Sequence, residues 1–139
     1  MEKSERILVP LDGSNCSENI LPKVEELASS LKAGVCLLRV TSAHTFPGVD
    51  PSEAEVKVVR EAEEYLKSLE DQLKAKGLDV DTHVRYENEA EEILDHASQK
   101  EIDLIAMSRR HGGVKHFLTG CVAEKVLRHT PKPIFLARC

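Results

Sequence analysis

The sequence predicts an α/β fold in which a five-stranded parallel sheet is covered by helices on both faces. Five short apolar runs alternate with segments whose apolar residues recur at helical spacing. No second compositional zone interrupts this alternation along the 139 residues. Such alternation favours parallel strands joined by right-handed crossovers. We therefore expect one domain, residues 1–139, long enough to bury a core.

The first half of the chain supplies two of the predicted strands. Ile7–Leu11 is a continuous apolar run, typical of a strand buried on both faces, and Pro10 should lie near its end because proline has no N–H donor. After the polar turn Asp12-Gly13-Ser14, helical spacing runs to Leu31. Pro22 lies in the first turns of that helix or marks a kink. Val35–Val40 is the second buried strand.

The second half repeats the pattern three times. Asp50 is predicted to cap a long helix that starts with Pro51 and ends near Lys76. Leu78–Arg85 alternates apolar and polar residues and is predicted as an edge strand, and a helix capped by Asn88 follows over 88–97. A buried strand is then predicted at Asp103–Met107, a helix at 114–128 and a last apolar strand at Ile134–Ala137.

Composition and charge exclude several classes of protein. The net charge of −5 argues against nucleic-acid binding, which needs clustered positive charge. No apolar run reaches the roughly 20 residues of a membrane span, and the N-terminus does not read as a signal peptide. The four cysteines lack C-x-x-C spacing, so we expect reduced thiols and no metal site. A cytoplasmic location is the resulting expectation.

The stretch from Asp103 to Val122, DLIAMSRRHGGVKHFLTGCV, has the order of an anion site. A strand, a glycine-containing loop and a helix N-terminus bring free N–H groups and the positive end of the helix dipole together. In parallel sheets ligands bind beyond the carboxyl ends of the strands, where strand order reverses. With the first strand central, that crevice lies between the Asp12 turn and the loop after Met107.

Four segments carry a family signature: ILVPLDGS, AEEIL, DLIAM and GGVKHFLTGCVAEKVLRHTPKPIFLAR. Together they resemble the universal stress protein family over essentially the whole chain. The resemblance implies a Rossmann-like, adenine-nucleotide α-hydrolase-like fold with strand order 3-2-1-4-5, commonly assembled as a homodimer. It also implies an adenine-nucleotide site, because many members bind ATP through Gly-x-x-Gly, nine residues, then Gly-Ser or Gly-Thr.

The phosphate motif is degenerate in this chain. Gly120 matches the last glycine, and counting back places the first two glycines at Met107 and Arg110. Alignment on DLIAM instead leaves the loop one residue short, with the first glycine missing and Arg110 still in place of the second. Cys121, a much weaker donor, occupies the hydroxyl position. Three of the four motif elements are therefore lost.

Other features would still allow an anion to bind. By the resemblance, Asp12 stands where relatives use an aspartate against the nucleotide, and Val40 where they contact adenine. Arg109 and Arg110 offer forked donors. Where many relatives carry Gly-x-Pro-Ala-Glu, this chain has Glu87-Asn88-Glu89-Ala90-Glu91, and the two extra carboxylates would repel a triphosphate if they face the crevice. The candidate nucleotide contacts are Pro10, Asp12, Val40, Arg109, Arg110, Gly112, Gly113, Gly120 and Cys121.

Each candidate also has a structural interpretation. Asp12 can cap the following turn, the two arginines can be exposed loop charges, and Gly112 and Gly113 can serve turn geometry. Gly120 can permit close helix–strand packing, and Cys121 can be a small packing residue or a reactive thiol. No catalytic constellation is recognisable, so no catalytic residue is assigned.

The preferred hypothesis is a non-enzymatic, homodimeric stress-response module in which ATP binding is weakened or lost, with no cofactor expected. The alternative is an ATP or AMP sensor with an altered phosphate loop, and slow ATP hydrolysis ranks third. The apolar last strand, Ile134, Phe135 and Leu136, lies at a sheet edge in the implied order. An exposed apolar edge needs a cover. We expect a second copy to provide it, with a terminal segment or helix as the alternative, and we expect no nucleic-acid or membrane partner.

Overall fold

The computed structural model describes residues 5–42, 48, 50–109 and 120–138. Its centre is a five-stranded sheet of order β3-β2-β1-β4-β5 in which every recorded pair is parallel. The strands are β1 (Arg6–Leu11), β2 (Gly34–Thr41), β3 (Val80–Tyr86), β4 (Ile102–Arg109) and β5 (Ile134–Arg138). The predicted fold class and strand order are both confirmed.

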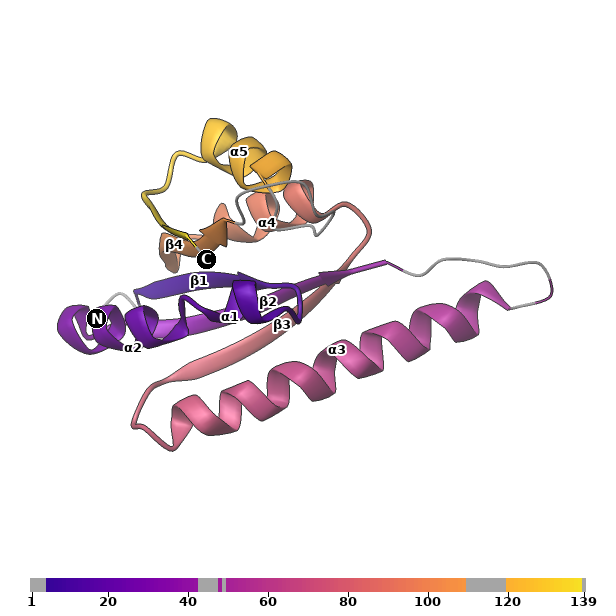
Figure 1. Cartoon of the computed structure of the whole chain (residues 1–139), viewed down its shortest axis with the longest axis horizontal. Helices are drawn as coiled ribbons and strands as arrows, with labels where there is room; N and C mark the ends of the chain where they lie inside the picture. Colours follow the sequence, from indigo (N-terminus) through magenta and orange to yellow (C-terminus); the bar gives the residue numbers. More distant parts are fainter. Residues whose placement is uncertain (1–4, 43–47, 49, 110–119, 139) are drawn as a thin grey trace.

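Helices cover both faces of the sheet. They are α1 (Asn15–Glu18), α2 (Leu21–Leu31), α3 (Pro51–Lys74), α4 (Glu89–Ala97) and α5 (Gly120–His129). Figure 1 shows α4 and α5 on one side of the sheet and α3 on the other. The four-residue α1 was not predicted, because one turn is too short to produce helical periodicity. The predicted fourth helix was expected from Val114, and its residues before Gly120 lie outside the described ranges.

Two apolar clusters fill the space between helices and sheet. On one face, Ile7, Val9 and Leu37 of the strands pack with Val24 of α2 and Leu66 of α3. On the other face, Leu8, Leu38 and Ile105 pack with Ile93 of α4 and Val126 of α5. Successive residues of β1 and β2 therefore enter opposite clusters, as strand geometry requires. This two-sided burial is why these strands read as continuous apolar runs.

Local signals in the sequence place the helix starts. Asp50 accepts a hydrogen bond from the Ser52 N–H at 2.9 Å, and Pro51 follows at the first helical position. Asn88 accepts from the Glu91 N–H at 3.0 Å and caps α4. Pro22 lies in the first turn of α2, where its missing N–H has no helical partner to lose. The predicted caps of α3 and α4 are confirmed.

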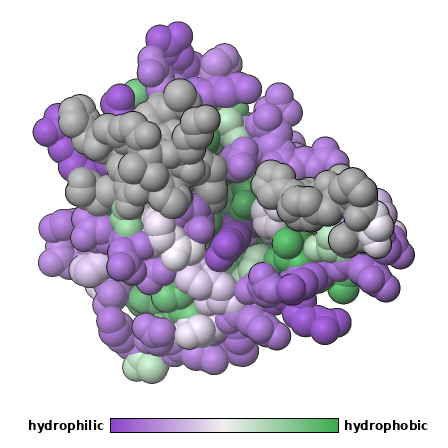
Figure 2. Space-filling model, turned by 45° about the vertical axis from the view of Figure 1, so that its right-hand side comes forward, coloured by the Kyte–Doolittle hydropathy of each residue, from purple (hydrophilic) through white to green (hydrophobic). Residues whose placement is uncertain are grey.

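The sheet edges are β3 and β5, as the sequence predicted. On the face of the molecule seen in Figure 2, hydrophilic side chains predominate and hydrophobic ones show in smaller areas. Within the described ranges, no helix combines the length and apolar character that crossing a membrane requires.

Candidate functional site

The carboxyl ends of β1 and β4 form the point at which strand order reverses. From β1 the chain continues to β2 on one side, whereas β4 pairs with β1 on the other side. Pro10 is buried near the end of β1, and Asp12 follows that strand directly. Arg109 is the half-buried last residue of β4. Topology therefore brings these three predicted residues to one edge of the sheet, where ligands of such sheets bind.

Asp12 organises the turn after β1. Its carboxylate Oδ1 accepts from the Ser14 N–H at 2.8 Å, and the Asp12 N–H donates to Ser17 Oγ at 3.2 Å. Ser14 in turn caps α1 by accepting from the Ser17 N–H at 3.1 Å, and the buried Ser17 hydroxyl donates to the Ser14 carbonyl at 2.9 Å. The structural interpretation of Asp12 as a capping residue is thus observed. One oxygen of the carboxylate is committed to the turn.

Gly13 is favoured at its position by its backbone conformation. Its φ of +86° lies in the left-handed region that favours glycine. An added Cβ would lie 2.8 Å from the guanidinium of Arg39, the far end of a flexible side chain that can move aside. Arg39, near the end of β2, thus lies directly against the turn.

Arg39 belongs to a polar chain beside the turn. Its guanidinium carbon lies 4.9 Å from the ring centroid of Tyr65 in α3, within cation–π distance. The Tyr65 hydroxyl donates to Glu18 of α1 at 2.5 Å. Burial, followed by the hydrogen bond to Glu18, raises the pKa of the Tyr65 phenol well above its ordinary value. Sequence analysis missed this group, because positions 18, 39 and 65 share no local motif.

The end of β4 lies where both alignments of the glycine motif begin. Met107 is fully buried within the strand, pairs with Leu136 of β5 and packs into the cluster under α4 and α5. In one alignment Met107 replaces the first glycine, and in the other that glycine is missing after Met107. Because β4 runs on to Arg109, both alignments begin inside the strand, and both lack the first glycine. Ser108, which follows Met107, is also fully buried, and its hydroxyl has no partner within the described part of the chain.

Glu87 is in a backbone conformation that suits glycine. It is exposed, follows β3 with a φ of +97°, and its N–H donates to the Thr41 carbonyl at the end of β2 at 2.8 Å. This is the position at which the resemblance places the glycine of Gly-x-Pro-Ala-Glu. The backbone has kept the glycine geometry although the residue is glutamate. A carboxylate side chain thus replaces a hydrogen atom at the carboxyl edge of the sheet.

The remaining predicted contacts divide into two groups. Val40 is buried at the end of β2 in the cluster under α4 and α5. Gly120 and Cys121 begin α5. Arg110, Gly112 and Gly113 lie outside the described residues.

Among the cysteines with described side chains, Cys36 is a free thiol and Cys16 is disulfide-bonded, so the expectation of reduced thiols is wrong for Cys16.

Comparison with known proteins identifies the family. The model of the universal stress protein family matches residues 3–138. Universal stress protein YxiE of Bacillus subtilis is 29% identical over 96% of this chain and 98% of its own length. The solved structure of hypothetical protein MJ0577 superposes with a TM-score of 0.82 at 26% identity, over 99% of this chain and 98% of that one.

A third comparison concerns a ligand. The universal stress protein from Archaeoglobus fulgidus, solved in complex with dAMP, has a TM-score of 0.69 at 20% identity and covers 97% of this chain and 98% of its own. At that identity the similarity shows a common fold. The family match over nearly the whole chain carries the assignment. The chain belongs to the universal stress protein family.

Proposed function

We propose that the protein is a non-enzymatic, homodimeric regulatory module of the stress response that binds adenine nucleotides weakly or not at all. The observation that carries the proposal is the loss of the phosphate loop. In both alignments the loop lacks its first glycine, and Arg110 and Cys121 replace the second glycine and the hydroxyl. Backbone N–H groups can approach a phosphate closely where glycines remove the side chains.

The described part of the crevice supports the same conclusion. Asp12 Oδ1 holds the turn through Ser14, so a nucleotide would have to share that carboxylate or displace the turn. Glu87 adds a negative charge at the carboxyl edge of the sheet. A triphosphate brought to that edge would meet the Glu87 carboxylate, where the family pattern has a glycine, and the added charge disfavours its binding. Regulation would then depend on protein contacts rather than on nucleotide turnover.

Equilibrium dialysis of the full chain with ATP tests the loss of binding. We expect a dissociation constant above about 1 mM, equivalent to less than about 4 kcal/mol of binding free energy. A matched variant restores the motif by inserting glycine after Met107 with Arg110→Gly and Cys121→Ser, and it should bind ATP measurably. Micromolar affinity in the unaltered chain would overturn the proposal. Phosphate release above a buffer control would overturn its non-enzymatic part.

A nucleotide sensor remains the second candidate, favoured by the dAMP complex of the Archaeoglobus fulgidus relative. In this function Asp12, Arg109, Arg110 and Gly120 would hold AMP or ATP through an altered loop. Native mass spectrometry of freshly purified protein would then detect an adenine nucleotide. Asp12→Ala would also reduce the rise in melting temperature that AMP causes. Absence of nucleotide together with unchanged shifts in Asp12→Ala would eliminate the sensor.

The outer edge of β5 supports the homodimer. Within the described residues β5 pairs with β4 alone, and its Leu136 side chain is 39% exposed. An apolar edge strand of this kind needs a cover, and a second copy is our proposed one. Light scattering should give twice the chain mass for the native protein and the chain mass for Leu136→Arg. Leu31→Arg alters a comparably exposed leucine on α2 and should stay dimeric. A monomeric native protein would refute the dimer.

A further inference from the structure

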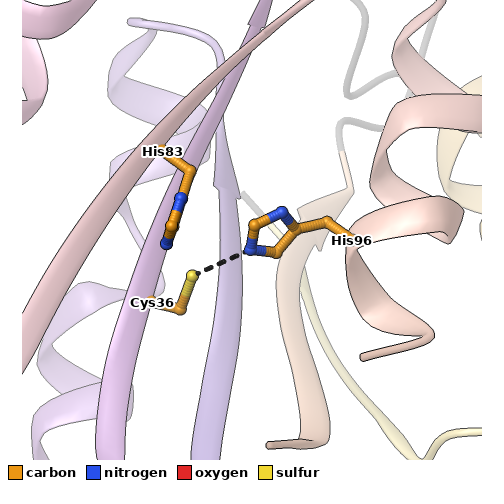
Figure 3. A group of neighbouring side chains, drawn as sticks. All are labelled: Cys36, His83 and His96. Carbon is orange, nitrogen blue, oxygen red and sulfur yellow. Dashed lines mark hydrogen bonds between the residues drawn. The ribbon is translucent and has the colours of Figure 1, made fainter. Parts of the chain in front are cut away.

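Cys36, His83 and His96 form a compact cluster on β2, β3 and α4 that we call the Cys36 cluster. One ligand atom from each side chain lies within 4.8 Å of the other two. Figure 3 shows His83 and His96 on either side of the Cys36 thiol. Cys36 lies four residues before Val40 on β2, which separates the cluster from the crevice edge by about 13 Å. The cluster is therefore a separate feature from the proposed nucleotide site.

The cluster has the donor types of a zinc site, and one of its distances is close to that of a zinc site. Zinc takes thiolate sulfur at about 2.3 Å and imidazole nitrogen at about 2.0 Å, so a tetrahedral site separates sulfur and nitrogen by about 3.5 Å. The observed distance from Cys36 Sγ to His96 Nε2 is 3.3 Å. The centroids of the two histidine rings are 4.6 Å apart. The three ligand atoms lie within 4.8 Å of one another, against about 3.3–3.5 Å in a tetrahedral site, so ion binding requires a side-chain rotation, which the partly exposed His83 permits.

Asp81 provides the outer carboxylate that histidine ligands of zinc usually have. It is the cross-strand partner of Cys36 in the β2–β3 register. Its Oδ2 lies 2.7 Å from His83 Nε2, and its Oδ1 pairs with Arg6 at 2.8 Å. Such a carboxylate fixes the orientation and tautomer of a ligating imidazole. With Nε2 held by Asp81, Nδ1 of His83 would be the nitrogen that binds the metal.

A different arrangement of protons holds the cluster without metal. The Arg85 Nε–H donates to His96 Nδ1 at 3.0 Å, so a neutral His96 carries its proton on Nε2 and donates to the Cys36 sulfur. Burial, and then the Asp81 carboxylate, raise the pKa of the Cys36 thiol well above its ordinary value. The cluster without metal is therefore a neutral thiol beside a neutral imidazole.

We propose that Cys36, His83 and His96 bind one Zn²⁺ ion, with the fourth coordination position open to solvent beside His83. The His83 side chain is 44% exposed, which gives the ion and a water molecule a route from solvent. On binding, Cys36 loses its proton to solvent and forms the Zn–S bond. The Nε2 proton of His96 moves to Nδ1, which frees Nε2 for the metal. One proton is released for each ion bound.

Arg85 opposes the movement of the His96 proton from Nε2 to Nδ1. Once Nδ1 of His96 carries a proton, it can no longer accept from the Arg85 guanidinium, so that hydrogen bond must break. Arg85 keeps its hydrogen bonds to Glu92 at 3.1 Å and to Asp95 at 2.5 Å, which can hold the guanidinium aside. In Arg85→Gln, the side-chain oxygen could accept from Nδ1 and act as an outer-shell partner. We expect that variant to bind zinc about tenfold more tightly.

The test uses the full chain, stripped with a chelator and titrated with Co²⁺ and with Zn²⁺. We expect one Co²⁺ per chain with a thiolate-to-cobalt charge-transfer band, and displacement of that ion by Zn²⁺. Calorimetry in two buffers of different ionisation enthalpy should show release of about one proton per Zn²⁺. His83→Gln, at a partly exposed position, should retain the fold and weaken binding at least about tenfold. His129→Gln removes an exposed histidine of α5 and should leave binding unchanged.

Three results would overturn the proposal. They are no stoichiometric binding of Co²⁺ or Zn²⁺ at micromolar protein, a charge-transfer band that persists in Cys36→Ser, and equal affinity in His83→Gln and His129→Gln. Zinc affinity unchanged in Arg85→Gln would remove the role given to Arg85. None of these outcomes depends on nucleotide binding, so the zinc site and the proposed function stand or fall separately.

Discussion

Acid should destabilise the metal-free protein through His96. This side chain is 3% exposed, accepts from Arg85 and lies 3.3 Å from the Cys36 sulfur. Burial is the main cause that lowers its pKa to about 4, followed by the neighbouring charges of His83 and Arg85. Asp81 and Glu101 act in the opposite direction.

The size of the effect follows from the difference between the two states. In the unfolded chain the pKa of histidine is about 6.5. Between about pH 6.5 and about pH 4 the unfolded state binds a proton that the folded state does not, so the free energy of unfolding falls as pH falls. The lowering of the His96 pKa from about 6.5 to about 4 makes the full loss of unfolding free energy about 3 kcal/mol, of which about 2 kcal/mol should be lost by about pH 5.

Urea denaturation in the presence of a chelator measures this loss. The native protein, His96→Gln and His129→Gln would each be unfolded at about pH 7.5 and about pH 5. We expect the native protein and His129→Gln to lose about 2 kcal/mol more between the two conditions than His96→Gln does. Equal losses in all three proteins would refute the assignment of acid sensitivity to His96.

Three further substitutions test the account of the fold, each by urea denaturation at neutral pH. Ser17→Ala leaves the Asp12 N–H without its acceptor in a buried turn and should lower the free energy of unfolding by about 1–3 kcal/mol. The control Ser98→Ala, at an exposed position, should lower it by less than about 1 kcal/mol, and equal losses would contradict the role of the turn. Glu87→Gly relieves a positive φ and should stabilise the protein by about 1 kcal/mol. The control Glu91→Gly, inside α4, should destabilise it, and a loss of stability in both variants would show that Glu87 is not strained. Leu66→Ala opens a cavity beneath α3 and should lower the free energy of unfolding by about 2–5 kcal/mol. Leu31→Ala, at an exposed position, should lower it by less than about 1 kcal/mol, and similar losses in the two variants would place Leu66 outside the core.

Much of the fold was accessible from the sequence because its signals are local. Continuous apolar runs mark strands buried on both faces, and Asp50, Pro51 and Asn88 mark helix starts through contacts with residues two or three positions away. The strand order came from the family resemblance rather than from these patterns. The single turn α1 was missed, since four residues cannot express a helical period.

Some features of the candidate site were likewise predicted from the sequence, and others required the structure. Comparison with the glycine motif that the family resemblance implies predicted a degenerate phosphate loop, and the position of Asp12 after β1 predicted its place at the crevice. The structure added that Met107 is buried and that β4 runs on to Arg109, so both alignments of the loop begin inside the strand. The link from Gly13 through Arg39 to Tyr65 and Glu18 joins residues of four segments, so no local pattern could reveal it.

The sequence, through its residue patterns and its family resemblance, predicted the fold class, the family and a degenerate phosphate motif, because each is written in short-range patterns of residue type. It predicted no metal site, since metal ligands are recognised in a sequence when they are close in number. Tertiary structure alone brought Cys36, His83 and His96 together, by pairing β2 with β3 in register and laying α4 across them. Packing in three dimensions decides which distant side chains share a site, and for this protein it adds a candidate zinc site that the spacing of its cysteines and histidines gave no reason to expect.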